Sequence, residues 1–374
     1  MNFSKNKFIL AMIFLIPLLV SLLLGYQFQG GRIKNIPTAI IDLDNSSLSR
    51  SIVSEIKANE IFAVKHYAGS YHQLQRLIHE NKARVGVVIP EDFSKDLKEY
   101  KAPKVLVLYD GSQMAVTSAA KARMSEILLT LKTAFVIKTI EGKLNLPPAK
   151  ALNRALPMSF EIRTVNNPTR NYGNFLIPGM IIALIQVGLA MAGVGLVDGD
   201  GNKSFPLLIK NLVYGFLGSL AVFLALGVLY LFFNIPYTGT LPGGILITYV
   251  YVTAVVALGI AVGTIIPSRL FATQVAAILV LPSSILGGYT WPLLAMPAGY
   301  QVFGNFLPFT HYAEVLRDLT LKNIGMEYVT GDLLWLVKFT FVMWGITVFV
   351  SILKRFFKSE NTRKGGALLS KSNT

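Results

Sequence analysis

The sequence contains no cysteine. Disulfides, Cys-ligated zinc sites, iron–sulfur clusters and thiol nucleophiles are therefore excluded, and any domain outside a membrane must be held together by its core alone. Charge is also scarce, because only 15% of the 374 residues are Asp, Glu, Lys or Arg, whereas 53% are hydrophobic. An ordinary soluble protein is about 25% charged. The composition therefore indicates an integral membrane protein.

Acidic residues are scarcer than basic ones: 20 Asp and Glu stand against 35 Lys and Arg, which gives a net charge of +15. Such an excess occurs in nucleic-acid-binding proteins, but in membrane proteins Lys and Arg gather beside the cytoplasmic ends of helices. We therefore expect the lipid bilayer to be a partner of this chain and expect no nucleic acid.

The motifs of common enzymes and metal sites are missing as well. The sequence has no Gly-x-Ser-x-Gly, no His-Glu-x-x-His and no paired carboxylates inside its apolar runs. Three histidines, His66, His72 and His79, lack an accompanying carboxylate pattern, which favours surface histidines over a zinc site. We expect no catalytic residue, metal or cofactor on this chain.

Residues 199–204 (GDGNKS) share glycine and lysine with a phosphate loop. However, Asn202 separates the glycine from the lysine, and the upstream glycine spacing fails. The same segment starts like a calcium loop, but Lys203 occupies the position where that loop needs glycine, and no Glu stands at the twelfth position. Neither nucleotide nor calcium is expected here.

Long apolar runs dominate what is present. Residues 8–25 are uncharged, follow Lys5 and Lys7, and end without a small-x-small cleavage site. They predict an uncleaved first transmembrane helix with a cytoplasmic N-terminus. Further apolar segments cover residues 174–197, 212–233, 243–266, 270–288 and 333–353, which gives six predicted spans.

The distribution of basic residues predicts the orientation of these spans. The predicted cytoplasmic stretches contain Lys203, Lys210 and Arg269, and a basic tail follows from residue 354. The opposing loop 234–242 has neither Lys nor Arg. The positive-inside rule therefore predicts cytoplasmic N- and C-termini and places residues 27–172 outside the cytoplasm.

Residues 27–172 have the pattern of a basic α/β domain rather than of a membrane segment. Short β-rich runs at 37–41, 61–66, 85–89 and 105–109 alternate with helical patterns. Ser46 and Ser70 stand where helix N-caps are expected, the latter in a capping box with Gln73. A long helix is predicted after Asp110, and 145–171 is a return segment to the membrane.

Residues 286–318 are apolar but are interrupted by seven Gly and Pro residues, so a single helix cannot cross the bilayer through them. Non-helical backbone at membrane depth occurs only where protein or a water-filled cavity satisfies it. We favour a re-entrant hairpin at about 289–325, with Trp291 and Tyr300 at the interface. An amphipathic loop on the outer surface is the alternative.

Three polar residues stand inside predicted spans. Gln186 and Gln274 are expected to form hydrogen bonds across helices. Lys338 lies near the outer end of the last span, where snorkelling is favoured over a substrate or gating role. Gly188, Gly193 and Gly195 would permit close approach of neighbouring helices.

Several separate motifs resemble those of type 2 ATP-binding-cassette (ABC-2) exporter permeases, in the subgroup with a large extracytoplasmic domain between the first two spans. In the outer domain these are residues 40–50 (IIDLDNSSLSR), 86–97 (GVVIPEDFSKDL) and 109–112 (YDGS). In the membrane they are 174–179 (NFLIPG), 291–297 (WPLLAMP), 307–312 (LPFTHY) and 316–317.

The resemblance implies a polytopic α-helical permease with six transmembrane helices, both termini in the cytoplasm and a re-entrant hairpin before the last span. The implied parts are residues 1–26 (cytoplasmic N-terminus and first span), 27–172 (extracytoplasmic α/β domain), 173–353 (spans two to six) and 354–374 (basic cytoplasmic tail). The outer gate would consist of Trp291, Pro292, Met296, Pro297, Tyr300, Leu307, Pro308, His311, Tyr312 and Arg317.

The resemblance also implies partners. A separate cytoplasmic ATPase subunit would hold ATP and Mg, and a second permease copy or a paralogue would complete a dimer in the bacterial inner membrane. A periplasmic adaptor protein is a further candidate. The cargo would be hydrophobic or amphipathic and would be moved out of the cytoplasm or the inner leaflet.

The sequence departs from the family after the second span. Members have a Glu-Arg-Glu-x-Gly-Thr-like sequence that forms the ATPase-docking helix, whereas this chain has glycines there. Either Ser204 caps a short helix, or coupling is altered, as in a degenerate half of a heteromeric exporter. The expected coupling residues are Asp198, Asp200, Lys203, Ser204, Phe205, Leu208 and Lys210.

Two rival functions remain open at this point. The chain could be a non-transporting scaffold whose outer domain binds an envelope or adaptor protein. It could also be an ion-driven secondary transporter, although the lack of carboxylates in the spans argues against that function.

Overall fold

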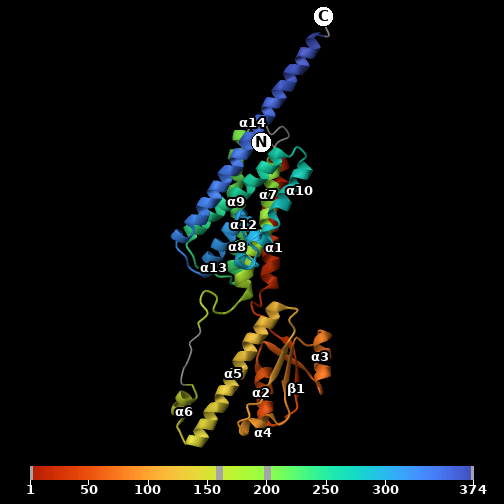
Figure 1. The fold of residues 1–374 in the computed structure, drawn as a ribbon. Helices are drawn as coiled ribbons and strands as arrows, with labels where there is room; N and C mark the ends of the chain where they lie inside the picture. The colour runs from red at the N-terminus through yellow and green to blue at the C-terminus, as the bar shows by residue number, and fades with distance from the viewer. Residues whose placement is uncertain (1–2, 157–162, 198–203, 372–374) are drawn as a thin grey trace. The chain divides into compact units, whose positions relative to one another are not determined.

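A computed structural model describes residues 3–156, 163–197 and 204–371, with side chains placed for residues 13–156, 163–197 and 204–357. The chain divides into two compact units (Figure 1). The membrane unit consists of Met1–Gly31 and Thr164–Thr374, and the α/β unit consists of Arg32–Arg163.

The α/β unit is built on a four-stranded sheet. Its strands are β1 (Ile36–Asp42), β2 (Phe62–Tyr67), β3 (Val85–Ile89) and β4 (Leu106–Tyr109), in the order β2-β1-β3-β4. β1 runs parallel to both neighbours, and β4 pairs antiparallel with β3. A central strand buried on both faces is expected to be continuously apolar, and five of the seven β1 residues are buried.

Helices cover both faces of this sheet. They are α2 (Ser47–Ala58), α3 (Tyr71–His79), α4 (Phe93–Lys98) and α5 (Met114–Leu144), whereas α6 (Pro148–Ala155) packs on α5. On one face, Ile52 and Ile56 of α2 and Met124 of α5 pack on the strands. On the other face, Leu74 of α3 packs on Ala39 and Ile41. The sheet therefore forms the middle layer of an α/β/α sandwich.

The predicted helix starts of this unit are confirmed, with one difference. Ser46 accepts hydrogen bonds from the N–H groups of Leu48 and Ser49, and Ser70 accepts one from Gln73. The Gln73 side chain, however, accepts from Gly69 at 2.9 Å rather than from the N-cap residue that a regular capping box uses. The return segment also contains α6, a helix that its four prolines did not indicate.

The membrane unit is all-helical in its described part. Its longer helices are α1 (Phe3–Gln27), α7 (Tyr172–Gly195), α8 (Ser204–Phe233), α9 (Leu241–Ile265), α10 (Arg269–Val280), α13 (Pro308–Leu321) and α14 (Thr330–Lys371). Short elements between them are α11 (Ser283–Leu286), η1 (Leu293–Ala295), α12 (Ala298–Asn305) and η2 (Met326–Tyr328).

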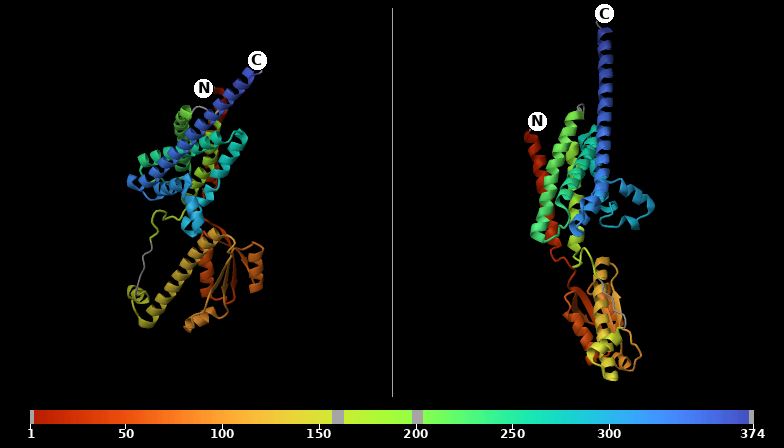
Figure 2. Two further views of the ribbon diagram at one scale, coloured as in Figure 1. Left: turned by 45° about the horizontal axis from the view of Figure 1, so that its top comes forward. Right: turned by 90° about the vertical axis from the view of Figure 1, so that its left-hand side faces the viewer.

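Five described segments are long and apolar enough to cross a membrane: Tyr172–Gly195, Ser204–Phe233, Leu241–Ile265, Arg269–Leu286 and Thr330–Phe357. Ile13–Gln27 of α1 adds a shorter apolar stretch. The protein is therefore a polytopic membrane protein. α9 contacts α7, α8 and α14 and is the most buried of these segments. Figure 2 shows the helices of this unit from two further sides.

Close approach of α7 and α9 depends on glycine. A methyl group built on Gly259 would lie 2.0 Å from the Ala190 carbonyl oxygen, and one on Gly193 would lie 2.4 Å from that of Val256. The expectation for Gly193 is thus confirmed. At Gly188, a methyl group would meet no atom within 4 Å among the described residues, so the close approach predicted for this position is not seen there.

Two helices differ in their bounds from the spans predicted for them. α8 begins no later than Ser204, eight residues before the predicted start at residue 212, because the polar residues of its first turns lie at a helix end and do not interrupt the helix. α10 ends at Val280, and a separate turn, α11, follows Pro282, whose ring interrupts the regular helix. Arg269–Leu286 as a whole is nevertheless long and apolar enough to cross a membrane, as predicted for 270–288.

Candidate functional site

The predicted gate stretch divides into two parts with opposite environments. The residues before α12 and on it are largely exposed: Trp291, Pro292, Pro297 and Tyr300 are all on the surface, and Met296 is half-buried. α13 is inserted into the core against α7, α9 and α14, with Leu307, Pro308 and Tyr312 buried. Only the second part is integrated into the helix bundle.

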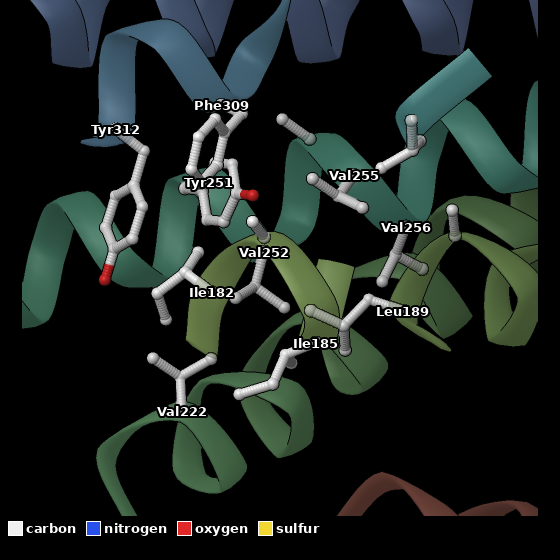
Figure 3. Packing of buried hydrophobic residues seen from close by; sticks show 14 of the residues in the cluster. Ile182, Ile185, Leu189, Val222, Tyr251, Val252, Val255, Val256, Phe309 and Tyr312 are labelled. Carbon is white, nitrogen blue, oxygen red and sulfur yellow. The ribbon is translucent and has the colours of Figure 1, made fainter. Parts of the chain in front are cut away.

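Two stacked tyrosines fix α13 on α9. The rings of Tyr312 and Tyr251 lie 4.2 Å apart and are nearly parallel. The Tyr312 hydroxyl is 2.9 Å from the Thr248 hydroxyl, one turn away on α9. Phe309 stands one turn before Tyr312, is also buried and belongs to the same apolar cluster as Ile182 and Val252 (Figure 3). The contact thus combines apolar packing with a hydrogen bond that fixes its register.

Arg317 attaches the other end of α13 to α7. Its guanidinium lies 4.4 Å from the ring centre of Phe175 and 4.0 Å from that of Tyr289, and it donates a hydrogen bond to the Tyr289 carbonyl. A guanidinium over two aromatic rings is favourable, and its planar group stacks on the rings while it also donates a hydrogen bond, a combination that the Lys ammonium reproduces poorly. Tyr289 in turn lies against Gly179, where any side chain would overlap its ring.

A buried hydrogen-bond network around Gln186 joins three helices of the membrane unit. The Gln186 amide nitrogen donates to the Ser283 hydroxyl at 2.7 Å, and its oxygen accepts from the Tyr251 hydroxyl at 2.9 Å. Gln186 is 1% exposed. The cross-helix role predicted for Gln186 is therefore confirmed, and it links α7 with α9 and α11.

Gln274 differs from Gln186 in its surroundings. It lies exposed on α10, and no hydrogen bond from it to another helix is seen among the described residues, so its predicted cross-helix role stays a prediction. Both amides stand in apolar runs of the sequence, so the two positions look alike there, but Gln274 lies on the exposed face of its helix. Lys338 is also exposed on α14, a placement that agrees with snorkelling.

His311 joins α12, α13 and α14. Its Nδ1 lies 2.7 Å from the Asp332 carboxylate and its Nε2 lies 2.9 Å from the Asn305 carbonyl oxygen. These two contacts tie the start of α13 to the end of α12 and to the first turn of α14. The ring also stacks on Trp335 of α14, with the ring centres 3.8 Å apart.

The opposite end of the membrane unit carries basic side chains on helix C-termini. Arg269 donates to the Gly195 carbonyl at 3.2 Å and Lys210 donates to that of Leu196 at 3.3 Å, both at the end of α7. Lys354 donates to the Thr264 carbonyl at 2.5 Å at the end of α9. Cations at these positions satisfy terminal carbonyls and the helix dipole.

The predicted coupling residues lie at this basic end as far as they are described. Asp198, Asp200 and Lys203 lie outside the described residues. Ser204 is the first described residue of α8, Phe205 is 73% exposed, and Leu208 is partly exposed. α8 continues unbroken to Phe233, so the separate short helix predicted after Ser204 is instead the first turns of α8.

Sequence reasoning missed four residues of these contacts: Thr248, Tyr251, Ser283 and Tyr289. Each is a hydroxyl-bearing residue in an apolar run, which is a detectable signal because a buried hydroxyl needs a partner in lipid. The partners themselves lie 28 to 97 residues away in sequence. Within the described ranges, no three His, Asp or Glu side chains gather as a metal site would require.

Comparison with known proteins decides the family. The model described as "ABC-2 family transporter protein" matches residues 7–349. The chain belongs to the ABC-2 transporter family. The resemblance of its motifs to ABC-2 permeases is therefore confirmed at the level of the family.

Relatives of this ABC-2 protein include permeases of bacteria. It is 22% identical to the probable multidrug ABC transporter permease YbhR of Escherichia coli, over 86% of this chain and 87% of that protein. It is 23% identical to YbhS of the same organism, with 89% of each covered. It is 24% identical to ABC transporter G family member 20 of Dictyostelium discoideum over 96% of this chain, but spans only 50% of that protein.

Proposed function

We propose that this ABC-2 protein is the permease subunit of an exporter that moves a hydrophobic or amphipathic substrate out of the cytoplasm or the inner leaflet. ATP and Mg would be held by a separate cytoplasmic ATPase subunit. The names of the bacterial relatives, which describe them as probable multidrug ABC transporter permeases, support this class of cargo.

One observation carries the proposal: the same two helices connect the basic end with the gate contacts. Near the start of α7, the Phe175 ring contacts the Arg317 guanidinium. At its end, the Gly195 carbonyl accepts a hydrogen bond from Arg269. These positions are 20 residues apart, or about 30 Å along a helix, which is the thickness of the hydrocarbon core. α9 likewise has Thr248 beside Tyr312 and Thr264 beside Lys354. A rigid-body tilt of α7 and α9 would therefore change both ends together.

The basic end gives the orientation. Lys and Arg favour the cytoplasmic side, so we place Lys210, Arg269 and Lys354 beside the ATPase and the gate contacts on the outer side. The chain leaves α1 at Gln27 and enters α7 at Tyr172, both at the gate end. We therefore propose that the α/β unit is extracytoplasmic and that the protein belongs to the subgroup with such a domain.

A dimer would complete the transport pathway. α10 exposes a row of large apolar side chains: Leu270, Phe271, Ile278 and Leu279. Beside it, an apolar groove of about 300 Å³ lies between α1, α7 and α10, with Ile13, Ile185, Leu189 and Thr273 in its wall. We propose that a second copy or a paralogue faces this surface in the bacterial inner membrane.

A periplasmic adaptor protein would bind the outer unit.

Export is tested in inside-out vesicles that contain this chain and its ATPase. We expect ATP-dependent uptake of an amphipathic dye, loss of uptake when the ATPase P-loop lysine is replaced, and loss when Phe205→Asp alters the coupling surface. Tyr67→Asp, an exposed aromatic position in the α/β unit, is the matched control.

Uptake that does not depend on the P-loop lysine would contradict a driven exporter and favour a secondary transporter. Assembly with the ATPase without any uptake of candidate cargo would favour a scaffold. Activity only with a second, different permease would identify this chain as one half of a heteromeric exporter.

A further inference from the structure

An apolar groove of about 820 Å³ lies within the α/β unit. α5 forms one wall, and α2, α4 and residues 100–105 form the other. Its size is within the range of about 300–1,000 Å³ that is usual for small-molecule sites. None of the gate or coupling residues belongs to it.

The groove exists because α5 is longer than the sheet that it covers. Its 31 residues correspond to about 46 Å, whereas a strand of seven residues spans only about 23 Å. The buried residues of α5, Ala120 and Met124, are both in its first half. In the second half, Phe135, Val136 and Ile140 are only partly buried and line the groove. Figure 1 shows this half of α5 diverging from α2 and α4.

The charged groups at the groove are positive. Lys132 and Lys138 line it and are exposed, and no Asp or Glu is among its described lining residues. Lys143 lies 3.9 Å above the ring of Tyr100, which is also a lining residue. The nearby carboxylates of Asp96 and Glu99 are already paired with Lys101. The two lining lysines are therefore available to an anion from outside.

We propose that this groove binds an anionic amphiphile, with its acyl chain among Leu97, Leu131 and Phe135 and its carboxylate or phosphate group on Lys132 and Lys138. The apolar wall selects a long hydrocarbon chain, and the lysines select negative charge over a neutral or positive headgroup. Exposure of this site outside the cytoplasm rests on the proposed function, but the binding chemistry does not.

The absence of native cysteine permits a direct test with the full chain in phosphatidylcholine nanodiscs. Ala134 lines the groove and is exposed, so Ala134→Cys can carry an environment-sensitive dye such as acrylodan. We expect dodecanoate to shift the emission to the blue in a saturable manner, whereas dodecanol and dodecylamine do so weakly. A blue shift already present in phosphatidylglycerol nanodiscs would identify a membrane lipid as the source.

The lysines are tested by a matched pair of variants. The double substitution Lys132→Gln and Lys138→Gln should weaken the apparent affinity for dodecanoate about tenfold or more, since charge-assisted hydrogen bonds are lost. Lys121→Gln with Lys150→Gln, both exposed outside the groove, should leave the affinity unchanged. All four positions are on the surface, so these variants are expected to fold.

Equal responses to dodecanoate and dodecanol, or no effect of the lysine variant, would overturn the proposal. A disulfide between the Ala134→Cys sites of two copies, formed before ligand is added, would show that a second copy occupies the groove, which would also overturn it. The assay contains neither ATPase nor ATP. Its failure is therefore distinguishable from a failure of the export proposal.

Discussion

Fully buried polar side chains hold the membrane unit together at the scale of single residues. Gln186, Thr248 and Ser283 are each at most 2% exposed, and each bonds to a different helix from its own. A buried polar group without a partner costs free energy because nothing in lipid can replace water. These side chains therefore determine which helix faces can meet.

Replacement of Gln186 tests this role. Gln186→Leu would leave the Tyr251 hydroxyl without its acceptor and the Ser283 hydroxyl without its donor. We expect a loss of about 1–3 kcal/mol in the free energy of unfolding, measured by thermal unfolding in detergent. Gln274→Leu, on an exposed face of α10, is the control and should unfold like the parent. Equal behaviour of the two variants would contradict the network.

Asp110 is the residue of the α/β unit with a marked pH response. The backbone N–H and hydroxyl of Ser112, together with the Arg84 guanidinium, lower the pKa of Asp110 to about 2. A lowered folded-state pKa stabilises the protein above the unfolded value of 3.8 and loses that effect as the pH falls toward 2.

We therefore expect pepsin to cleave the α/β unit increasingly as the pH falls from about 4 to 2, where Asp110 becomes protonated. Asp110→Asn should already be more easily unfolded than the parent at pH 5–7, and the difference should shrink as the pH falls toward 2, where about half of Asp110 is protonated. A parent and variant that differ equally at all pH values would show that the ionised carboxylate is not responsible.

At the scale of the elements, packing distances and exposure separate helices that have similar composition. α7 and α9 approach backbone to backbone at Gly193 and Gly259. By contrast, Val302 and Phe303 of α12 and Phe306, which directly follows it, lie on the surface, each at least half exposed. Contacts within the chain therefore hold α7 against α9, whereas the apolar face of α12 needs lipid or a partner to cover it.

Gly259→Ala tests the contact between α7 and α9. The added methyl group would overlap the backbone oxygen of Ala190, which no rotamer change can relieve. We expect destabilisation of about 1–3 kcal/mol, as for other overpacked cores, measured as a lower unfolding midpoint. Gly227→Ala, with open space around its α-carbon on α8, should unfold at the parent midpoint or slightly above it. A tolerated Gly259→Ala would refute the close approach.

The environment of α12 tests whether the gate stretch enters the membrane. A nitroxide on Val302→Cys should be relaxed more by oxygen, which concentrates in lipid, than by a water-soluble nickel complex, because apolar side chains surround this exposed face. The same label on Gln75→Cys, an exposed position of α3, should show the reverse preference. A water-like response at Val302 would favour the surface loop over the re-entrant hairpin.

For the whole molecule, the decisive property is the side of the membrane on which each end and the α/β unit lie. The three cation-to-carbonyl contacts at the ends of α7 and α9 mark one end as basic, and the chain enters and leaves the α/β unit at the other. Charge bias determines insertion through the short loops, so one orientation is strongly favoured.

Two single-cysteine variants test this orientation in intact cells. A membrane-impermeant maleimide should label Gln75→Cys directly and should label Phe205→Cys, exposed at the basic end, only after the inner membrane is permeabilised. Both reactive sites are exposed within their own unit, so access and not burial is measured. The opposite pattern would invert the topology and would make an outer gate at α13 untenable.

Much of the fold was determined by the sequence alone. Strands β1 to β4 were predicted within one residue of their bounds, since short β-rich runs between turn signals are a local property. Apolar runs likewise predicted the long helices, and Ser46 and Ser70 predicted helix starts. The ABC-2 motifs, also local strings, identified the family.

Only the tertiary structure decided which of these residues meet. Gln186 and Gln274 are both amides in apolar runs, yet one bonds to Ser283 and Tyr251 and the other lies on the surface. Likewise, the gate stretch has one continuous composition but is exposed at α12 and buried at α13. The physical reason is that an apolar run specifies burial in lipid or protein but not which face packs on which helix. That choice depends on distant small and polar residues, such as Gly193 against Gly259, whose contacts form only when all the helices are assembled.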